Sequence, residues 1–162
     1  MTATDRLAQF VALSTELTAF TAFELHGTGQ APAYLSTVDE VVGEQLVDDL
    51  VALYTQIRDE APEADAFARR LRADVLSDER LGPVARNIIK LWYVGIWYEL
   101  PRAWREAFGA RENGASFTVS ATSYTEGLLW PAIGASPPGA KPPGYGSWAD
   151  PPRIPQHDGA TP

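Results

Sequence analysis

Side chains that commonly carry catalysis or bind metals are few in this 162-residue chain, which has no cysteine and two histidines. A di-iron helical bundle needs Glu-x-x-His pairs on facing helices, but the residues three positions before His26 and His157 are Phe23 and Ile154. A Ser-His-acid triad needs a histidine in a structured pocket, whereas His26 is expected at a helix end and His157 in a tail. The sequence therefore favours a chain with neither a metal site nor a nucleophilic centre.

Glu99 and the glycine-rich segment 139–146 are two further candidates for chemistry. Glu99 is the one acid in an apolar setting, and it is interpreted as a surface acid or a partner of Arg102. The alternative is that Glu99 is the base of a small stand-alone helical enzyme. The segment GAKPPGYG, residues 139–146, lacks the spacing of a phosphate-binding loop and a preceding strand, so it is interpreted as a turn-rich tail.

The acidic composition argues against nucleic acid as a partner. The net charge is −8, and a phosphate-binding face needs clustered Lys and Arg. Nine acids and one base, Arg58, lie between Asp39 and Asp65. This stretch is either a solvated helix face or an electrostatic docking face.

No membrane span or export signal is expected. No segment reaches the ~18 continuous apolar residues that a transmembrane helix requires. The N-terminal residues MTATDRLAQF have neither a basic region nor a cleavable apolar stretch. A cytoplasmic location is therefore expected from the sequence as written, with the periplasm as the alternative if a signal was removed.

Apolar residues at three- and four-residue spacing predict an all-α domain over residues 5–109, a compact bundle of four or five helices. The first helix is expected to fade near Gly27, and Thr37 with Glu40 forms a predicted capping box for the second. Pro62 suits the first turn of the third helix, and Pro101 limits the central one. The expected helices are residues 5–27, 37–58, 62–75, 83–99 and 102–108.

The central helix contains the most apolar run of the chain, IIKLWYVGIWYEL from Ile88 to Leu100. Its aromatic residues form two pairs five positions apart, with Gly95 between them: Trp92, Tyr93, Trp97 and Tyr98. As a helix the run is apolar nearly all round. Such a helix is buried on several sides or offers one face to a partner.

Beyond Gly109 the composition changes, and residues 110–162 are expected to form a long Pro/Gly-rich extended arm. Alternation from Phe117 to Ala121 predicts a short strand. Nine of the 13 prolines follow in the 32 residues from Pro131 onward. Four large aromatic residues interrupt the arm: Tyr124, Trp130, Tyr145 and Trp148. Extended chain with spaced aromatic anchors is typical of a segment that lies on another surface, either a partner or the helices of its own chain.

Three segments resemble a known family: FVALSTELT (residues 10–18), LWYVGIWY (residues 91–98) and GYGSWADPP (residues 144–152). Together they resemble the small (gamma) subunit of membrane-associated FAD-dependent sugar and alcohol dehydrogenases, the sorbitol, fructose and glucose dehydrogenase complexes. The resemblance covers most of the chain from Phe10 onward. The elements Trp92–Gly95 and Trp148–Pro152 are its most specific parts.

The resemblance implies a non-catalytic subunit that holds no cofactor and supports the folding of a large flavoprotein. That partner is of the glucose-methanol-choline type, binds FAD and oxidises an alcohol carbon; a cytochrome c subunit often accepts the electrons. The family's small subunit carries a twin-arginine signal, which this sequence lacks. A second hypothesis is a transient chaperone for redox-enzyme maturation. The residues expected to bind the partner are Trp92, Tyr93, Trp97, Tyr98, Tyr124, Trp130, Tyr145, Trp148, Asp150 and Pro151.

Overall fold

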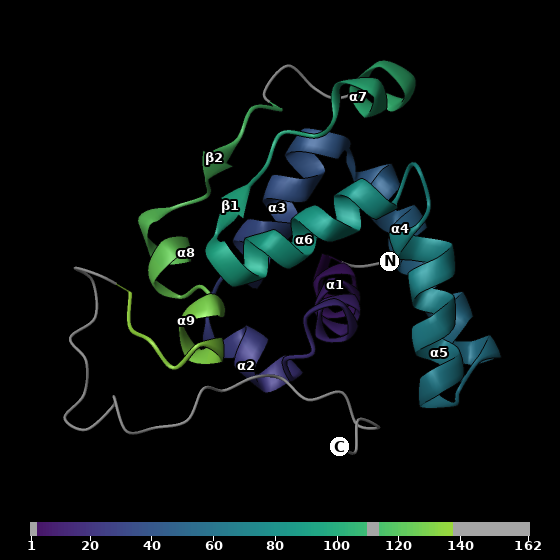
Figure 1. Cartoon of the computed structure of the whole chain (residues 1–162), viewed down its shortest axis with the longest axis horizontal. Coiled ribbons are helices and arrows are strands. Elements are labelled where there is room, and N and C mark those ends of the chain that lie inside the picture. The colour runs from purple at the N-terminus through teal and green to yellow at the C-terminus, as the bar shows by residue number, and fades with distance from the viewer. Residues whose placement is uncertain (1–2, 110–113, 138–162) are drawn as a thin grey trace.

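The computed structural model describes residues 3–109 and 114–137, and nearly all regular structure in them is helical (Figure 1). The longer helices are α1 (Ala3–Thr18), α3 (Ala31–Val42), α4 (Glu44–Glu60) and α6 (Gly82–Val94). The shorter helices are α2 (Ala22–Gly27), α5 (Ala64–Arg70) with the π-helical turn η1 (Leu71–Leu76), α7 (Arg102–Phe108), α8 (Ala121–Thr125) and α9 (Leu129–Ala132). Two short antiparallel strands, β1 (Ile96–Trp97) and β2 (Phe117–Thr118), pair with each other. The predicted all-α class is confirmed for these residues.

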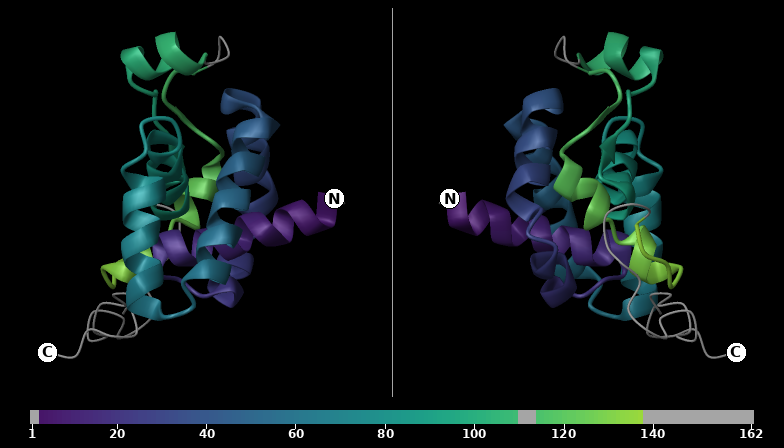
Figure 2. Two further views of the ribbon diagram at one scale, coloured as in Figure 1. Left: turned by 90° about the vertical axis from the view of Figure 1, so that its right-hand side faces the viewer. Right: turned by 90° about the vertical axis from the view of Figure 1, so that its left-hand side faces the viewer.

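The core lies where α1 contacts α3, α4 and α6. Figure 2 shows α3 and α4 on one side of the molecule and α6 on the other. Fully buried apolar side chains from all four helices meet there, including Phe10, Val38, Leu50 and Ile88. Each helix therefore buries the apolar stripe that its three- and four-residue spacing predicts.

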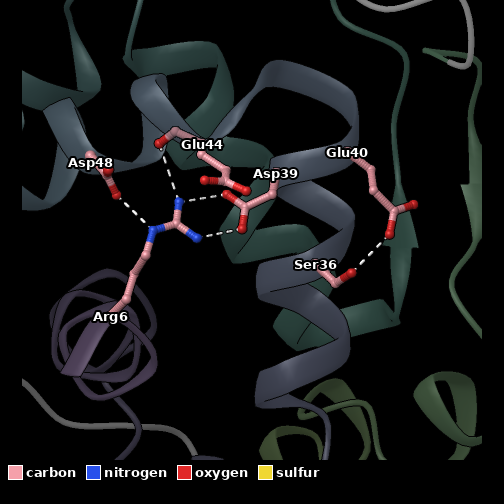
Figure 3. A network of polar contacts seen from close by, with 6 residues as sticks. All are labelled: Arg6, Ser36, Asp39, Glu40, Glu44 and Asp48. Atoms are coloured by element: carbon pink, nitrogen blue, oxygen red, sulfur yellow. Dashed lines mark hydrogen bonds and ion pairs between the residues drawn. The ribbon is translucent and has the colours of Figure 1, made fainter. Parts of the chain in front are cut away.

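Arg6 joins the first helix to the next two long helices (Figure 3). Its Nη2 donates to Oδ1 of Asp39 on α3 at 2.7 Å, and its Nε donates to Oδ1 of Asp48 on α4 at 2.7 Å. Nη2 also donates to the carbonyl oxygen of Glu44 at 3.2 Å. Since Arg6 and Asp39 are mostly buried, each depends on the other for compensation of its charge.

Other acids of the acidic stretch also face basic residues of the same chain. Asp49 pairs with Arg80 at 2.7 Å, and Glu60 pairs with Arg70 at 3.0 Å. Arg70 thereby joins α5 to the acidic helix α4. Part of the acidic stretch serves contacts within the chain rather than facing only solvent.

The first predicted helix is wrong at its C-terminal end, because the chain breaks between α1 and α2. Ala19 adopts a left-handed conformation (φ 61°), which ends α1. Thr21 then caps α2: its side chain accepts from the backbone N–H of Glu24, and the Glu24 carboxylate accepts from the backbone N–H of Thr21 at 2.9 Å. This reciprocal pair is a capping box, which fixes a new helix start.

The second predicted helix is wrong at its start and in its continuity. Helix α3 already begins at Ala31, with Pro32 in its first turn, where a missing N–H costs nothing. Thr37 lies inside α3 and is buried, so it caps nothing; Glu40 instead accepts a hydrogen bond from Ser36 at 2.8 Å (Figure 3). Gly43 (φ 91°) then separates α3 from α4, a conformation that favours glycine.

The central helix ends five residues earlier than predicted. It stops at Val94, because Gly95 adopts the left-handed conformation (φ 69°) and its N–H bonds the carbonyl of Leu91 at 2.9 Å. The following residues become strand β1 instead of another helical turn. The predicted short helix from Arg102 to Phe108 is confirmed.

Candidate partner-binding surface

The C-terminal end of α6 is completed by a segment that follows it much later in the chain, residues 117–128, which we call the capping segment. The last carbonyls of an α-helix have no partner within the helix. Here the N–H of Leu128 donates to the carbonyl of Trp92 at 2.9 Å. The carbonyl of Gly95 accepts from the N–H of Val119 and from Oγ of Ser123, both at 3.0 Å. The capping segment therefore packs on its own helical domain.

Two glycines allow this close approach. A Cβ on Gly95 would lie 2.4 Å from the carbonyl oxygen of Ser123, and one on Gly127 would lie 2.7 Å from that of Tyr93. Both distances are far below van der Waals contact with backbone atoms that cannot move aside. Gly95 lies inside the helix that the sequence predicts over residues 83–99, and no local pattern marks Gly127.

The four aromatic residues of the central run have different environments. Trp92 and Trp97 are 1% and 0% exposed and belong to the core. Tyr93 is partly buried, and its hydroxyl donates to the carbonyl of Thr18 at 3.0 Å. Only Tyr98 is exposed, with the Lys90 ammonium 4.7 Å from its ring centroid. In this conformation the two tryptophans present almost no surface to another protein.

The other predicted contact residues divide between the described part and the remainder of the chain. Tyr124 is exposed and Trp130 is partly buried, and their rings meet edge to face at 5.4 Å. The indole Nε1 of Trp130 also donates to the carbonyl of Tyr124 at 2.8 Å. The remaining predicted residues lie outside the described residues: Tyr145, Trp148, Asp150 and Pro151.

A pocket lies between α2 and the α8–α9 region, and we call it the α2–α9 pocket. It has a volume of about 320 Å³. Its lining includes the aromatic side chains of Phe20 and Trp130 and the acidic residues Glu24 and Glu126. The two helical regions, far apart in sequence, lie near each other at the lower edge of the molecule in Figure 1. The pocket thus combines apolar walls with negative charge.

The negative charge of Glu126 acts on a buried residue of the core, Tyr34. Burial raises the pKa of the Tyr34 hydroxyl, and the charge of Glu126 raises it further. This hydroxyl has no hydrogen-bond partner among the described residues. Tyr34 in turn contacts Trp92 edge to face at 5.0 Å, so the pocket and the aromatic core are neighbours.

One exposed aromatic residue of α2 is not among the contact residues predicted from the sequence. Phe23, next to the lining residue Glu24, is 86% exposed, and Ile133 near α9 is 52% exposed. The available signal was Thr21 with Glu24 three positions later, a capping box that starts a separate short helix. That helix buries only Leu25, which explains why Phe23 remains outside.

The candidate chemical groups lie apart from one another. Glu99 is exposed and pairs with Arg105 at 2.7 Å, whereas the expected partner Arg102 pairs with Glu106. His26 lies in the last turn of α2, as expected of a helix-end residue. Among the residues that the structure describes, no group of three or more His, Asp or Glu side chains is arranged to hold a metal ion.

Within residues 3–109 and 114–137, no helix combines the length and apolar character needed to cross a membrane. Comparisons with known proteins add no further assignment. No protein-family model matches the chain, and neither a search of curated proteins nor one of solved structures found a match.

Proposed function

We propose that the chain is the non-catalytic small subunit and folding partner of a FAD-dependent sugar or alcohol dehydrogenase. FAD and the substrate would be bound by the large flavoprotein subunit, and a cytochrome c subunit would be a further member of the complex. The proposal begins from the resemblance in residues 10–18, 91–98 and 144–152. Its physical support comes from the surface of the helical domain.

The observation that carries the proposal is the set of large apolar side chains outside the core. Tyr124 and Trp130 belong to the capping segment and α9, and Trp130 lines the α2–α9 pocket; Phe23 on α2 and Ile133 after α9 are also exposed. Exposed apolar residues scattered singly are ordinary, but a pocket lined by a partly exposed tryptophan is typical of a protein-binding surface. The same chain buries Trp92 and Trp97 completely, so it has a core that does not need these side chains.

Such a subunit acts by covering apolar surface on the large subunit while that protein folds and loads its flavin. The preformed geometry of Trp130 favours this role, because a side chain already held by a hydrogen bond loses little conformational entropy on binding. Truncation of such an anchor typically costs about 2 kcal/mol, on the order of thirtyfold in affinity.

The test is co-expression with a candidate large flavoprotein subunit from the same organism. We expect soluble, flavin-loaded large subunit only in the presence of this chain, measured by soluble yield and by FAD absorbance per polypeptide. An unrelated small helical protein serves as the control. Equal yield and flavin content without the chain would contradict the proposal.

Size-exclusion chromatography of the active enzyme separates this proposal from the transient chaperone. A stable complex that contains both chains is expected of a subunit. An active enzyme that elutes without this chain, after needing it for maturation, would favour the chaperone instead.

A further inference from the structure

The exposed side of α6 carries two basic side chains that have no acidic partner. Arg86 and Lys90 lie one turn apart, and both are exposed. Most basic residues of the described part of the chain pair with a carboxylate, but no carboxylate there lies within ion-pairing distance of Arg86 or Lys90. Like charges one turn apart on a helix repel each other and destabilise it. Carboxylates of a partner would relieve this repulsion.

A tyrosine ring lies beside these charges and is held in place. The Lys90 ammonium is 4.7 Å from the centroid of the Tyr98 ring. The buried side chain of Asn87 fixes the backbone of Tyr98, because its Nδ2 donates to the Tyr98 carbonyl at 2.8 Å and its Oδ1 accepts from the Tyr98 N–H at 3.3 Å. Nη1 of Arg86 donates to the carbonyl of Leu76 at 2.6 Å. Neither a carbonyl nor a ring neutralises a full positive charge, so these contacts order the side chains and leave their charge available.

We call Arg86, Lys90 and Tyr98 the basic face, and its shape favours a protein surface over a small anion. Small molecules bind in concave pockets, whereas these side chains are exposed on α6 and β1 and do not line the α2–α9 pocket. Tyr98, which is 38% exposed, adds apolar contact area and a hydroxyl, and tyrosine and arginine are the residue types enriched at protein interfaces. Tyr98 also belongs to the segment of residues 91–98 that carries the family resemblance.

We propose that the basic face of α6 binds carboxylates of the large flavoprotein subunit, with the Tyr98 ring packing beside them. The inference rests on the proposed function and deepens it by naming a contact surface and the acidic chemistry of its partner. The chain as a whole carries a net charge of −8 and repels an acidic surface. A local basic face therefore fixes the orientation in which the two subunits meet, and this attraction weakens as ionic strength rises.

The first test is zero-length cross-linking of the purified complex with a carbodiimide, which joins an amine to a carboxylate in direct contact. The chain has two lysines, Lys90 and Lys141, so mass spectrometry assigns the bond to one residue. We expect an amide between Nζ of Lys90 and an aspartate or glutamate of the large subunit. The matched control is Lys90→Arg, which keeps the charge and removes the reactive amine. This bond should then be absent while the amount of complex is unchanged.

The second test is a competition for a limiting amount of large subunit between the natural chain and a variant with a different affinity tag. Arg86→Gln/Lys90→Gln should be depleted roughly tenfold, because it removes both charges and keeps residues that favour helix. The matched control, Arg69→Gln/Arg72→Gln, removes the same charge from two exposed arginines of α5 and η1 and should be recovered in equal amount.

A single charge reversal separates docking from the stability of the free chain. Lys90→Glu changes the net charge as much as the double variant and leaves the hydrogen bond from Arg86 to Leu76 intact. It should be depleted to a similar extent, roughly tenfold, while thermal denaturation of the free chain shows an unchanged midpoint.

Recovery of Arg86→Gln/Lys90→Gln within about threefold of the natural chain would overturn the basic face as a docking surface and leave the proposed function standing. Equal depletion of the control variant would also overturn it, since it would reflect overall charge. So would a Lys90 that is acetylated as readily in the complex as in the free chain, or that cross-links to a second copy of this chain. If the natural chain forms no complex with the flavoprotein, the proposed function and the basic face are both wrong.

Discussion

The aromatic residues at the end of α6 and the exposed aromatic residue of α2 differ in what holds them. Trp92 is enclosed by Phe10, by Tyr34 and by the capping segment, whose Leu128 bonds its carbonyl. Phe23 belongs to a six-residue helix in which only Leu25 is buried. Residue type alone therefore does not decide whether an aromatic side chain builds the core or lies on the surface. The decisive factor is whether a later segment of the chain covers it.

The largest expected effect comes from removal of the most enclosed side chain. Trp92→Ala should lower the free energy of unfolding by about 4 kcal/mol, because it deletes a buried ring and leaves a cavity. The measurement is chemical denaturation monitored by circular dichroism. Trp92→Phe should cost much less, since the indole Nε1 that it removes has no hydrogen-bond partner among the described residues. Equal losses for both variants would show that the indole nitrogen matters more than the volume.

The next largest effect tests the approach of the capping segment. Gly95→Ala should cost about 3 kcal/mol, from the left-handed backbone and the overlap of the new Cβ with the carbonyl of Ser123. Gly27→Ala is the matched control, since its Cβ would meet no atom within 4 Å and alanine favours helix. Thermal denaturation of both variants gives the comparison. A Gly95→Ala protein as stable as the control would mean that the capping segment does not lie against α6.

Loss of the ion pairs of Arg6 should lower the free energy of unfolding less than either Trp92→Ala or Gly95→Ala. Arg6→Ala should cost about 2 kcal/mol, because Asp39 is mostly buried and loses its partner. Arg102→Ala, which breaks an exposed pair with Glu106, should cost below about 0.5 kcal/mol. Urea denaturation at low and high salt provides the measurement. A loss for Arg6→Ala that disappears in high salt would show that its pairs are effectively exposed.

Tyr34 contacts Trp92 at the end of α6 and is affected by the charge of Glu126 in the pocket lining. Its contribution to the stability of the folded chain should depend on pH. Burial and the charge of Glu126 raise the pKa of its hydroxyl above the ordinary value near 10. The folded protein then holds this proton more tightly than the unfolded chain, so stability is unaffected below about pH 10 and falls as the pH rises above it. Tyr34→Phe should flatten this alkaline loss and change little at pH 7. An unchanged slope between pH 9 and 11 would contradict the assignment to Tyr34.

The smallest effect on folding should come from the most exposed ring. Phe23→Ala should change the free energy of unfolding of the isolated chain by less than about 0.5 kcal/mol, as is usual for surface substitutions. Calorimetry of the free chain tests this, in contrast to the loss expected for Trp92→Ala. A loss above about 1 kcal/mol would indicate that Phe23 packs within its own chain.

The sequence predicted the helical class and the short helix α7, because their periodicity and stop signals are local. The predicted helix boundaries are wrong where two local signals competed. Thr37 with Glu40 resembled a helix start, but Pro32 had already begun α3, and the true capping box was Thr21 with Glu24. Gly95 lies inside the helix predicted over residues 83–99, whereas its left-handed conformation ends α6.

The candidate surface was predicted only in part, because its assembly depends on contacts between distant segments. The predicted residues Tyr98, Tyr124 and Trp130 are at least partly accessible. Phe23 was missed because the continuous first helix that was expected gave no reason to separate it from its neighbours. The pocket brings residues of α2 beside residues more than 90 positions later, and no local pattern encodes that approach.

The hydrogen bonds that complete α6 also set an order of events during protein synthesis. Ser123 is made 28 residues after Gly95, whose carbonyl it satisfies. At ~5–20 residues per second, α6 therefore emerges from the ribosome roughly 1–6 s before Ser123 does. In that interval the capping segment cannot yet cover the surface around Trp92. Any protein that contacts the nascent chain in this interval meets a surface different from that of the finished chain.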